Sequence, residues 1–102
     1  MPDNPRVAVL TQMLAADPAN SFARYGLAME HIKANDFATA ISEFEMILTN
    51  DPSYSAAYFH GGQTAEKAGD LDKARSFYER GLLNSRDAHA RAEMQGALDL
   101  LP

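Results

Sequence analysis

The sequence predicts an all-α fold in which about six helices stack as antiparallel pairs into a superhelical solenoid. Three observations predict it. The chain repeats itself with a period of 34 residues, its apolar side chains recur at helical spacing, and no segment sustains the two-residue alternation of a strand. The repeat carries the most weight, because a fixed period of this length is typical of stacked helical hairpins.

The repeat is found by aligning the segment that starts at Ser21 with the segment that starts at Ser55. Asp17-Pro18 and Asp51-Pro52 punctuate the chain at the same offset. The identical pairs are Ser21/Ser55, Ala23/Ala57, Lys33/Lys67, Ala34/Ala68, Asp36/Asp70, Ala40/Ala74, Ser42/Ser76, Glu45/Glu79 and Leu48/Leu82. Chance alignment would give only a few such identities, so the segments are two copies of one unit.

Each unit is predicted to form two helices. In the first unit, Ser21 is expected to cap one helix, Asn35 to break it, and Asp36 to cap the next helix. That second helix should stop before Asp51-Pro52, because a residue that precedes proline is pushed out of the α region. The apolar residues at helical spacing are Phe22, Tyr25, Met29 and Ile32, followed by Phe37, Ala40, Ile41, Phe44, Ile47 and Leu48.

The second unit repeats this plan. Its first helix is expected to end at Gly69, which suits the left-handed conformation after a helix, and Asp70 is expected to cap the second helix. The apolar side of that second helix is predicted to hold Leu71, Ala74, Phe77, Tyr78, Leu82 and Leu83.

Two further helices flank the units. Asn4 and Pro5 are expected to open one, and Asp87 to cap the other. We therefore expect one domain over residues 1–102, divided into an N-terminal helix (5–17), repeat 1 (21–54), repeat 2 (55–88) and a C-terminal capping helix (89–101).

Composition excludes several classes of protein. The formal net charge is −5 and the basic residues are scattered, whereas nucleic acids and anionic membranes attract clustered positive charge. The sequence has no cysteine, which excludes disulfides and thiolate chemistry. We find no signal peptide and no apolar run long enough to span a bilayer, so a cytoplasmic location is the default expectation.

The residue types at set places in the repeat resemble the tetratricopeptide repeat (TPR) family. The second unit carries Ala57-Tyr58, Gly62, Gly69-Asp70-Leu71, Ala74, Tyr78 and Gly81-Leu82, and the first carries Leu27-Ala28, Asn35-Asp36-Phe37, Ala40, Phe44, Leu48 and Asp51-Pro52. The resemblance covers nearly the whole chain. It implies a TPR-like α-α superhelix that serves as a protein interaction scaffold.

Some positions invite a specific interpretation. Ala28 with Ala40, and Gly62 with Ala74, should lie where paired helices approach most closely. Arg24 stands where the family usually has a large apolar residue, which predicts either a weakened core or a solvated edge. The pair Gly61-Gly62 is interpreted as a flexible spot in the array.

No motif for chemistry stands out. His31, His60 and His89 lie on different predicted helices without the spacing of a helical metal site, so no metal is expected. The carboxylates are dispersed and several stand at helix starts, where they favour the helix dipole. We expect no enzymatic activity and no cofactor.

The resemblance implies a partner-binding surface, because the first helix of each unit lines the concave face of these arrays. Carried over by register, this surface holds Phe22, Tyr25, Met29, Phe59, Gln63 and Lys67, and it continues over Glu93 and Ala97. Tyr25, Met29 and Phe59 are then expected as exposed apolar anchors. The alternative for Phe22 and Tyr25 is ordinary packing against the opening helix.

The predicted function is therefore a scaffold that binds a peptide segment or helix of a partner protein in a shallow apolar groove. The alternative is a homo-oligomerisation module that pairs through the groove or through terminal-helix residues, namely Val7, Leu10, Met94 and Leu98. Family members that bind chaperone tails clamp a terminal carboxylate with basic and amide side chains. The matching places here are Tyr25, Met29, His60, Ala90 and Met94, so that activity is not expected.

Overall fold

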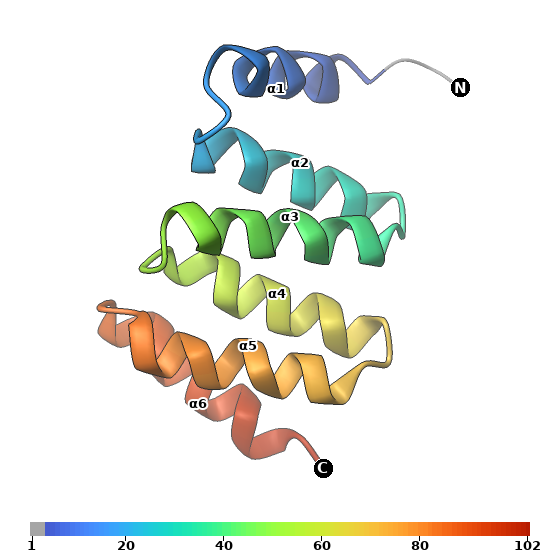
Figure 1. Cartoon of the computed structure of the whole chain (residues 1–102). Helices are drawn as coiled ribbons and strands as arrows, with labels where there is room; N and C mark the ends of the chain where they lie inside the picture. Colours follow the sequence, from blue (N-terminus) through green and yellow to red (C-terminus); the bar gives the residue numbers. More distant parts are fainter. Residues whose placement is uncertain (1–3) are drawn as a thin grey trace.

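In a computed structural model that describes residues 4–102, the chain is an all-α stack of antiparallel helices (Figure 1). The helices are α1 (Pro5–Ala16), α2 (Ser21–Lys33), α3 (Phe37–Asn50), α4 (Ser55–Lys67), α5 (Leu71–Asn84) and α6 (Ala88–Leu100). No strand occurs among the described residues. The predicted fold class, an all-α solenoid of about six helices, is confirmed.

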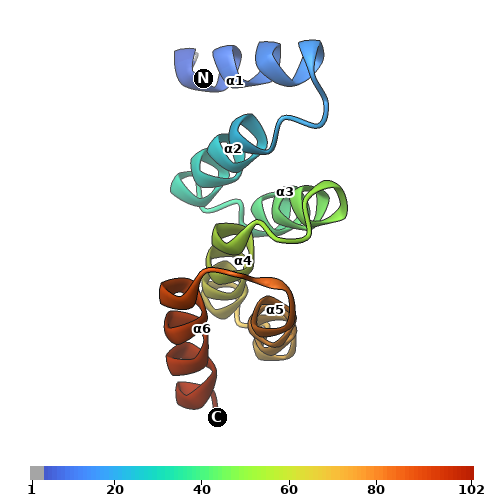
Figure 2. The same ribbon diagram turned by 90° about the vertical axis from the view of Figure 1, so that its left-hand side faces the viewer.

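The helices form a curved, elongated array with extents of 39 × 27 × 19 Å. In Figure 2, α2, α4 and α6 follow one another along one side, while α3 and α5 lie on the other side, to the right. Each helix packs mainly on its neighbours in sequence, and α4 also contacts α6. The first helices of successive units therefore share one face of the stack.

Short polar side chains start most of the helices, as predicted. Asn4, Asp36, Asp70 and Asp87 each accept hydrogen bonds from backbone N–H groups in the first turn of the helix that follows.

The prediction for the start of α2 was wrong by one residue. Asn20 is the cap, and its Oδ1 accepts a bond from the Ala23 N–H at 3.0 Å. Ser21 is already the first residue of the helix.

The two hairpin turns share one geometry. Asn35 and Gly69 have φ of 60° and 80°, the left-handed region expected just after a helix. The next residue then reaches back over the last turn of the helix. The Asp36 N–H donates to the His31 carbonyl at 2.8 Å, and the Asp70 N–H donates to the Ala65 carbonyl at 2.9 Å. This Schellman arrangement reverses the chain in each unit.

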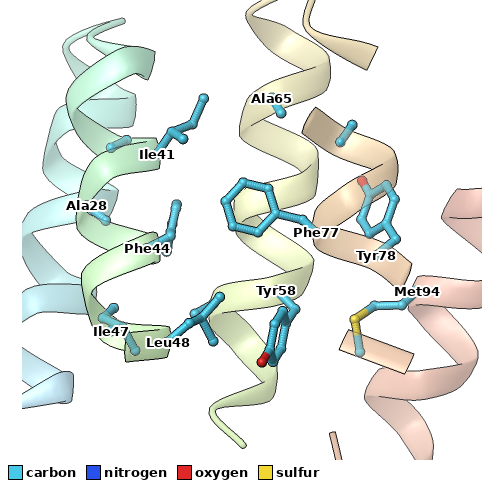
Figure 3. Close-up of a cluster of buried hydrophobic side chains, with 13 residues drawn as sticks. Ala28, Ile41, Phe44, Ile47, Leu48, Tyr58, Ala65, Phe77, Tyr78 and Met94 are labelled. Carbon is cyan, nitrogen blue, oxygen red and sulfur yellow. The ribbon is translucent and has the colours of Figure 1, made fainter. Parts of the chain in front are cut away.

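The main core runs from α2 to α6. Its largest fully buried side chains include Phe44, Phe77, Tyr78 and Met94, and Figure 3 shows these residues gathered between neighbouring helices. Leu83, predicted to face this core, is instead 83% exposed. Its position in the last turn of α5 places it one step beyond the buried stripe.

The glycine pair in α4 is a tight packing site. A Cβ on Gly61 would lie 2.6 Å from the Phe77 ring, and a Cβ on Gly62 would overlap the Tyr78 ring. Both glycines are buried. The interpretation of this pair as a flexible spot is wrong, because the absence of a side chain lets α5 lie directly against α4.

Arg24 joins the two helices of the first unit. Its guanidinium Nη1 lies 3.1 Å from Oε2 of Glu43 on α3, and its Nη2 donates to the Pro18 carbonyl at 3.1 Å. The Arg24 and Glu43 side chains are only 12% and 16% exposed. The site is neither a weakened core nor a solvated edge; a largely buried ion pair replaces the apolar contact.

Helix α1 stands apart from the main core. Leu10 packs with Ala23 and Leu27 of α2 in a separate small cluster. Around it, Glu30 of α2 accepts a bond from Asn4 Nδ2 at 2.9 Å and lies 3.5 Å from Nε of Arg6. Among the described residues, the N-terminal helix is therefore attached mainly through α2.

Candidate functional site

A shallow pocket of about 410 Å³ opens between α4 and α6, with α5 at its floor. These two helices follow α2 along one side of the stack (Figure 2). It is lined by Phe59, Gln63, Glu66, Tyr78, Glu93, Gly96, Ala97 and Leu100. We call it the groove pocket. It combines an apolar floor with a rim of one amide and two carboxylates.

The floor of the groove pocket is fixed by the tight packing of α5 on α4. Because Gly62 has no side chain, the Tyr78 ring lies against the α4 backbone and its hydroxyl donates a hydrogen bond to Glu66. Burial, and then this bond to the carboxylate, raise the pKa of Tyr78 well above its usual range. The phenol therefore stays protonated and holds the Glu66 carboxylate in place.

Aromatic contacts link the groove pocket to α2. The ring centroids of Tyr25 and His60 are 5.7 Å apart, and those of His60 and Phe59 are 5.5 Å apart. The centroid of the Tyr25 ring also lies 6.1 Å from that of Phe44 and 6.0 Å from that of Tyr54. The edge-on geometry of several of these pairs is the favoured arrangement for aromatic rings. These rings form a series of contacts from α2 to Phe59, which lines the pocket.

Burial among these rings disfavours the charged form of His60 and lowers its pKa. A hydrogen bond with Gln63 and the negative charge of Glu93 oppose this shift, while the positive charge of Lys67 adds to it. The imidazole is thus a neutral part of the surface at neutral pH.

The predicted binding residues fall into three groups. Phe59 and Gln63 line the groove pocket, together with Glu93 and Ala97 from the predicted continuation. Lys67 is exposed at the last residue of α4, outside the pocket lining.

Tyr25 and Met29 form the second group and are half-buried. They pack against the main core, as does Phe59. These three side chains are therefore less exposed than expected, because neighbouring helices cover part of each one, and their role as anchors stays a prediction.

Phe22, the third case, lies elsewhere. Its side chain is 66% exposed and lines a second pocket of about 420 Å³ between α1 and α2. We call this the N-terminal pocket; its other lining residues are Pro5, Arg6, Val9, Leu10 and Met13. Phe22 is therefore separate from the groove pocket.

Sequence reasoning missed four residues of the groove pocket. Gly96 and Leu100 lie three residues after Glu93 and Ala97, so extending that stripe along α6 would have found them. Glu66 follows Gln63 at the same spacing. Tyr78 was assigned to the core, and its contribution to the pocket floor depends on the gap that α4 and α6 leave above it.

Two residues proposed for self-association are largely covered within the single chain. Leu10 and Met94 are buried against neighbouring helices. Val7 and Leu98 are partly buried. This set of side chains therefore offers little exposed surface, and pairing through the terminal helices stays a prediction.

Among residues 4–102, no group of three or more histidine, aspartate and glutamate side chains is arranged to hold a metal ion. No helix in this part of the chain is long and apolar enough to cross a bilayer.

Stacked antiparallel helix pairs of equal length, with an open face along their first helices, define a helical-repeat protein. The model of the tetratricopeptide repeat family matches residues 25–100. The chain therefore belongs to the tetratricopeptide repeat family, whose fold is a protein–protein interaction module and which generally has no enzymatic activity.

Three similar proteins illustrate the relationship. A TPR repeat-containing protein of Pseudomonas aeruginosa is 34% identical over 88 residues, covering 83% of this chain and 84% of the relative. The crystal structure of a tetratricopeptide repeat domain protein from Salinibacter ruber is 32% identical, with a TM-score of 0.69, covering 78% of this chain and 91% of that one.

The third is the first TPR of Spaghetti (RPAP3), solved bound to the HSP90 peptide SRMEEVD. It is 25% identical, with a TM-score of 0.75, and the match covers 93% of this chain and 76% of that one.

Proposed function

We propose that this chain is a cytoplasmic scaffold that binds a peptide segment or helix of a partner protein across its first helices and performs no chemistry of its own. One observation carries the proposal: the groove pocket is a mainly apolar hollow with polar side chains beside it, between the first helices α4 and α6. Apolar pockets with a few polar groups at the edge are the usual form of recognition sites.

The lining of the groove pocket favours a particular ligand. Phe59, Ala97 and Leu100 offer apolar surface for one anchoring side chain of the partner. Glu66 and Glu93 place two carboxylates beside that surface, and the chain carries a net charge of −5. A segment with an apolar anchor flanked by lysine or arginine complements both features.

An acidic peptide with a free carboxyl end is a poor match for the same surface. At the places where carboxylate-clamping members need basic side chains, Tyr25 and His60 contact each other and Met94 is buried. The carboxylates at the rim would repel an anionic terminus. We therefore expect this chain not to bind the kind of peptide seen with the RPAP3 domain.

The test uses three synthetic fluorescent peptides with one aromatic or leucine anchor, flanked by lysines, by glutamates or by serines. Fluorescence polarisation should show the tightest binding for the lysine peptide. Phe59→Ala should weaken that binding by about tenfold, because interface anchors of this type contribute about 1–2 kcal/mol. Phe22→Ala is the matched control, since it removes an exposed aromatic from the other pocket. Equal binding of all three peptides, or no effect of Phe59→Ala, would contradict the proposal.

A second candidate function is self-association, and the N-terminal pocket favours it. Phe22 and Val9 are 66% and 56% exposed beside it. Exposed apolar side chains gathered around a hollow usually mark a contact surface.

A further inference from the structure

The contact between the two helices of a unit provides a template for the ends of the array. In the second unit, a Cβ on Gly61 would meet the Phe77 ring, and a Cβ on Gly62 would meet the Tyr78 ring. One turn away, a Cβ on Gly81 would lie 2.8 Å from Cβ of Tyr58. These pairs define how a second helix, such as α5, covers a first helix, such as α4.

The N-terminal pocket lies where a first helix would pack. Two 34-residue periods separate α1 from α5, so the residues that α5 buries against α4 correspond to residues of α1. Ala74, Phe77, Tyr78 and Gly81 correspond to Arg6, Val9, Leu10 and Met13, respectively. All four of these α1 residues line the N-terminal pocket. Helix α1 therefore has the form of a second helix whose first helix is absent from the structure.

Helix α6 presents the complementary surface. One period separates it from α4, so Tyr58, Gly61, Gly62 and Ala65 correspond to Ala92, Gln95, Gly96 and Asp99. The α4 residues are buried beneath α5, whereas the four α6 residues are exposed. A Cβ on Gly96 would meet nothing within 4 Å. Helix α6 therefore has the form of a first helix with no second helix packed on it in the described structure.

We propose that α6 of one copy of this chain docks into the N-terminal pocket of the next copy, so that the two ends together complete one repeat. This rests on the second candidate function, self-association, and names its surfaces and its partner. By the template, Gly96 of one copy lies against Leu10 of the next, as Gly62 lies against Tyr78. Ala92 lies against Met13, and these two residues correspond to Tyr58 and Gly81 in the second unit. The large side chain comes from the first helix in the second unit and from the second helix in the proposed interface.

Charge complementarity supports the same pairing. One turn further along the template, the second unit has Ala74 on α5 and Ala65 on α4. The corresponding residues in the proposed interface are Arg6 of one copy and Asp99 of the other. Arg6 lies 3.5 Å from Glu30 in its own chain, yet its side chain remains 58% exposed. Asp99 accepts one bond from Gln95 at 2.9 Å and is exposed. Opposite charges at matching positions fix the register of an interface.

The interface is heterologous, because different surfaces of the two copies meet. Such contacts leave a free α6 and a free N-terminal pocket at the ends of every assembly, so growth continues unless the assembly closes into a ring. We expect mass to rise steadily with concentration rather than to stop at a dimer.

Sedimentation velocity over a wide range of concentrations tests the proposal. The wild-type chain should associate, and either Asp99→Arg or Arg6→Asp should weaken association by at least about tenfold, as reversal of a close charge pair does at other interfaces. Mixing the two variants should restore association, because each then meets an opposite charge at both ends. A mixture that stays monomeric while the wild type associates would refute the Arg6–Asp99 pairing.

Gly96→Leu provides a test that does not depend on charge. Because the space around Gly96 is open in the single chain, this variant should fold with an unchanged or raised Tm and still associate more weakly. It also guards against loss of fold in Arg6→Asp, which places a carboxylate beside Glu30. A wild type that is monomeric throughout would overturn self-association as a whole. If neither Gly96→Leu nor Asp99→Arg affects association, only the docking of α6 into the N-terminal pocket would be overturned.

Discussion

The ring of His60 shows how one residue joins the core to the candidate site. It lies edge-on to both Tyr25 and Phe59, on the helix that carries one wall of the groove pocket. Burial lowers its pKa below the ordinary value of 6.5, because the imidazolium form would lose its hydration. The folded chain therefore binds a proton at His60 less readily than the unfolded chain does.

This linkage predicts a pH dependence of stability. Between pH 6.5 and the lower folded pKa, the unfolded state binds a proton at His60 and the folded state does not. Stability is therefore complete above this window and falls as the pH decreases through it. The Tm should decrease between about pH 7.5 and about pH 5.5, and His60→Gln should reduce that decrease. His89→Gln, on the exposed side of α6, is the control that should retain it.

Single residues also mark where sequence reasoning was weakest. The shift of the α2 cap from Ser21 to Asn20 could not be predicted with certainty, because both are good capping residues and stand side by side. Arg24 was misjudged because its partner Glu43 is 19 residues away, and no local pattern links them. Contacts across helices decide such cases.

The packing of α5 on α4 is the element-scale feature that forms the groove pocket. Ala28, Ala40, Gly62 and Ala74 were predicted from the repeat register to lie at close helix contacts, and all four are buried. The register gives the positions but not the depth of contact. Only the structure shows that the Tyr78 ring fills the place of the missing Gly62 side chain and reaches Glu66.

We predict opposite effects for two glycine substitutions in helices. Gly62→Ala should lower the free energy of unfolding by about 1–3 kcal/mol, because the added methyl group overlaps the Tyr78 ring. Gly96→Ala should raise it by about 0.5–1 kcal/mol, because the site is open and alanine is the better helix former. Urea denaturation measures both. Equal effects of the two substitutions would show that α4 and α5 pack less closely than described.

The candidate site was predicted only in part, because the sequence does not show how far neighbouring helices cover one another. Helical spacing and the family register placed Phe59, Gln63, Glu93 and Ala97 on the inner face, and these residues line the groove pocket. Spacing along one helix does not tell how far the next helix covers that face. Tyr25 and Met29 were therefore placed on the correct helix with too much exposure.

At the scale of the whole molecule, the core divides into two unequal clusters. The larger cluster joins α2 through α6, while α1 contributes Leu10 to a small cluster with Ala23 and Leu27. An element that packs on a single neighbour can detach without opening the rest of the structure. Stability should therefore vary along the array.

Amide hydrogen exchange should reveal this gradient. Backbone amides in α4 and α5, which have neighbours on both sides, should exchange slowest, and those in α1 should exchange fastest among the six described helices. Leu10→Ala should accelerate exchange in α1 and leave α5 almost unchanged, because the two clusters are separate. Uniform protection from α1 to α5 would instead indicate one cooperative unit.

The nearly exclusive contact of each helix with its neighbours in sequence has a consequence for biosynthesis. Chains dominated by short-range contacts fold quickly, since little loop-closure entropy must be overcome before contacts form. The hairpin of α2 and α3 contains its own turn, its own ion pair and part of the core. It is thus able to begin assembling while the ribosome is still adding the residues of α5.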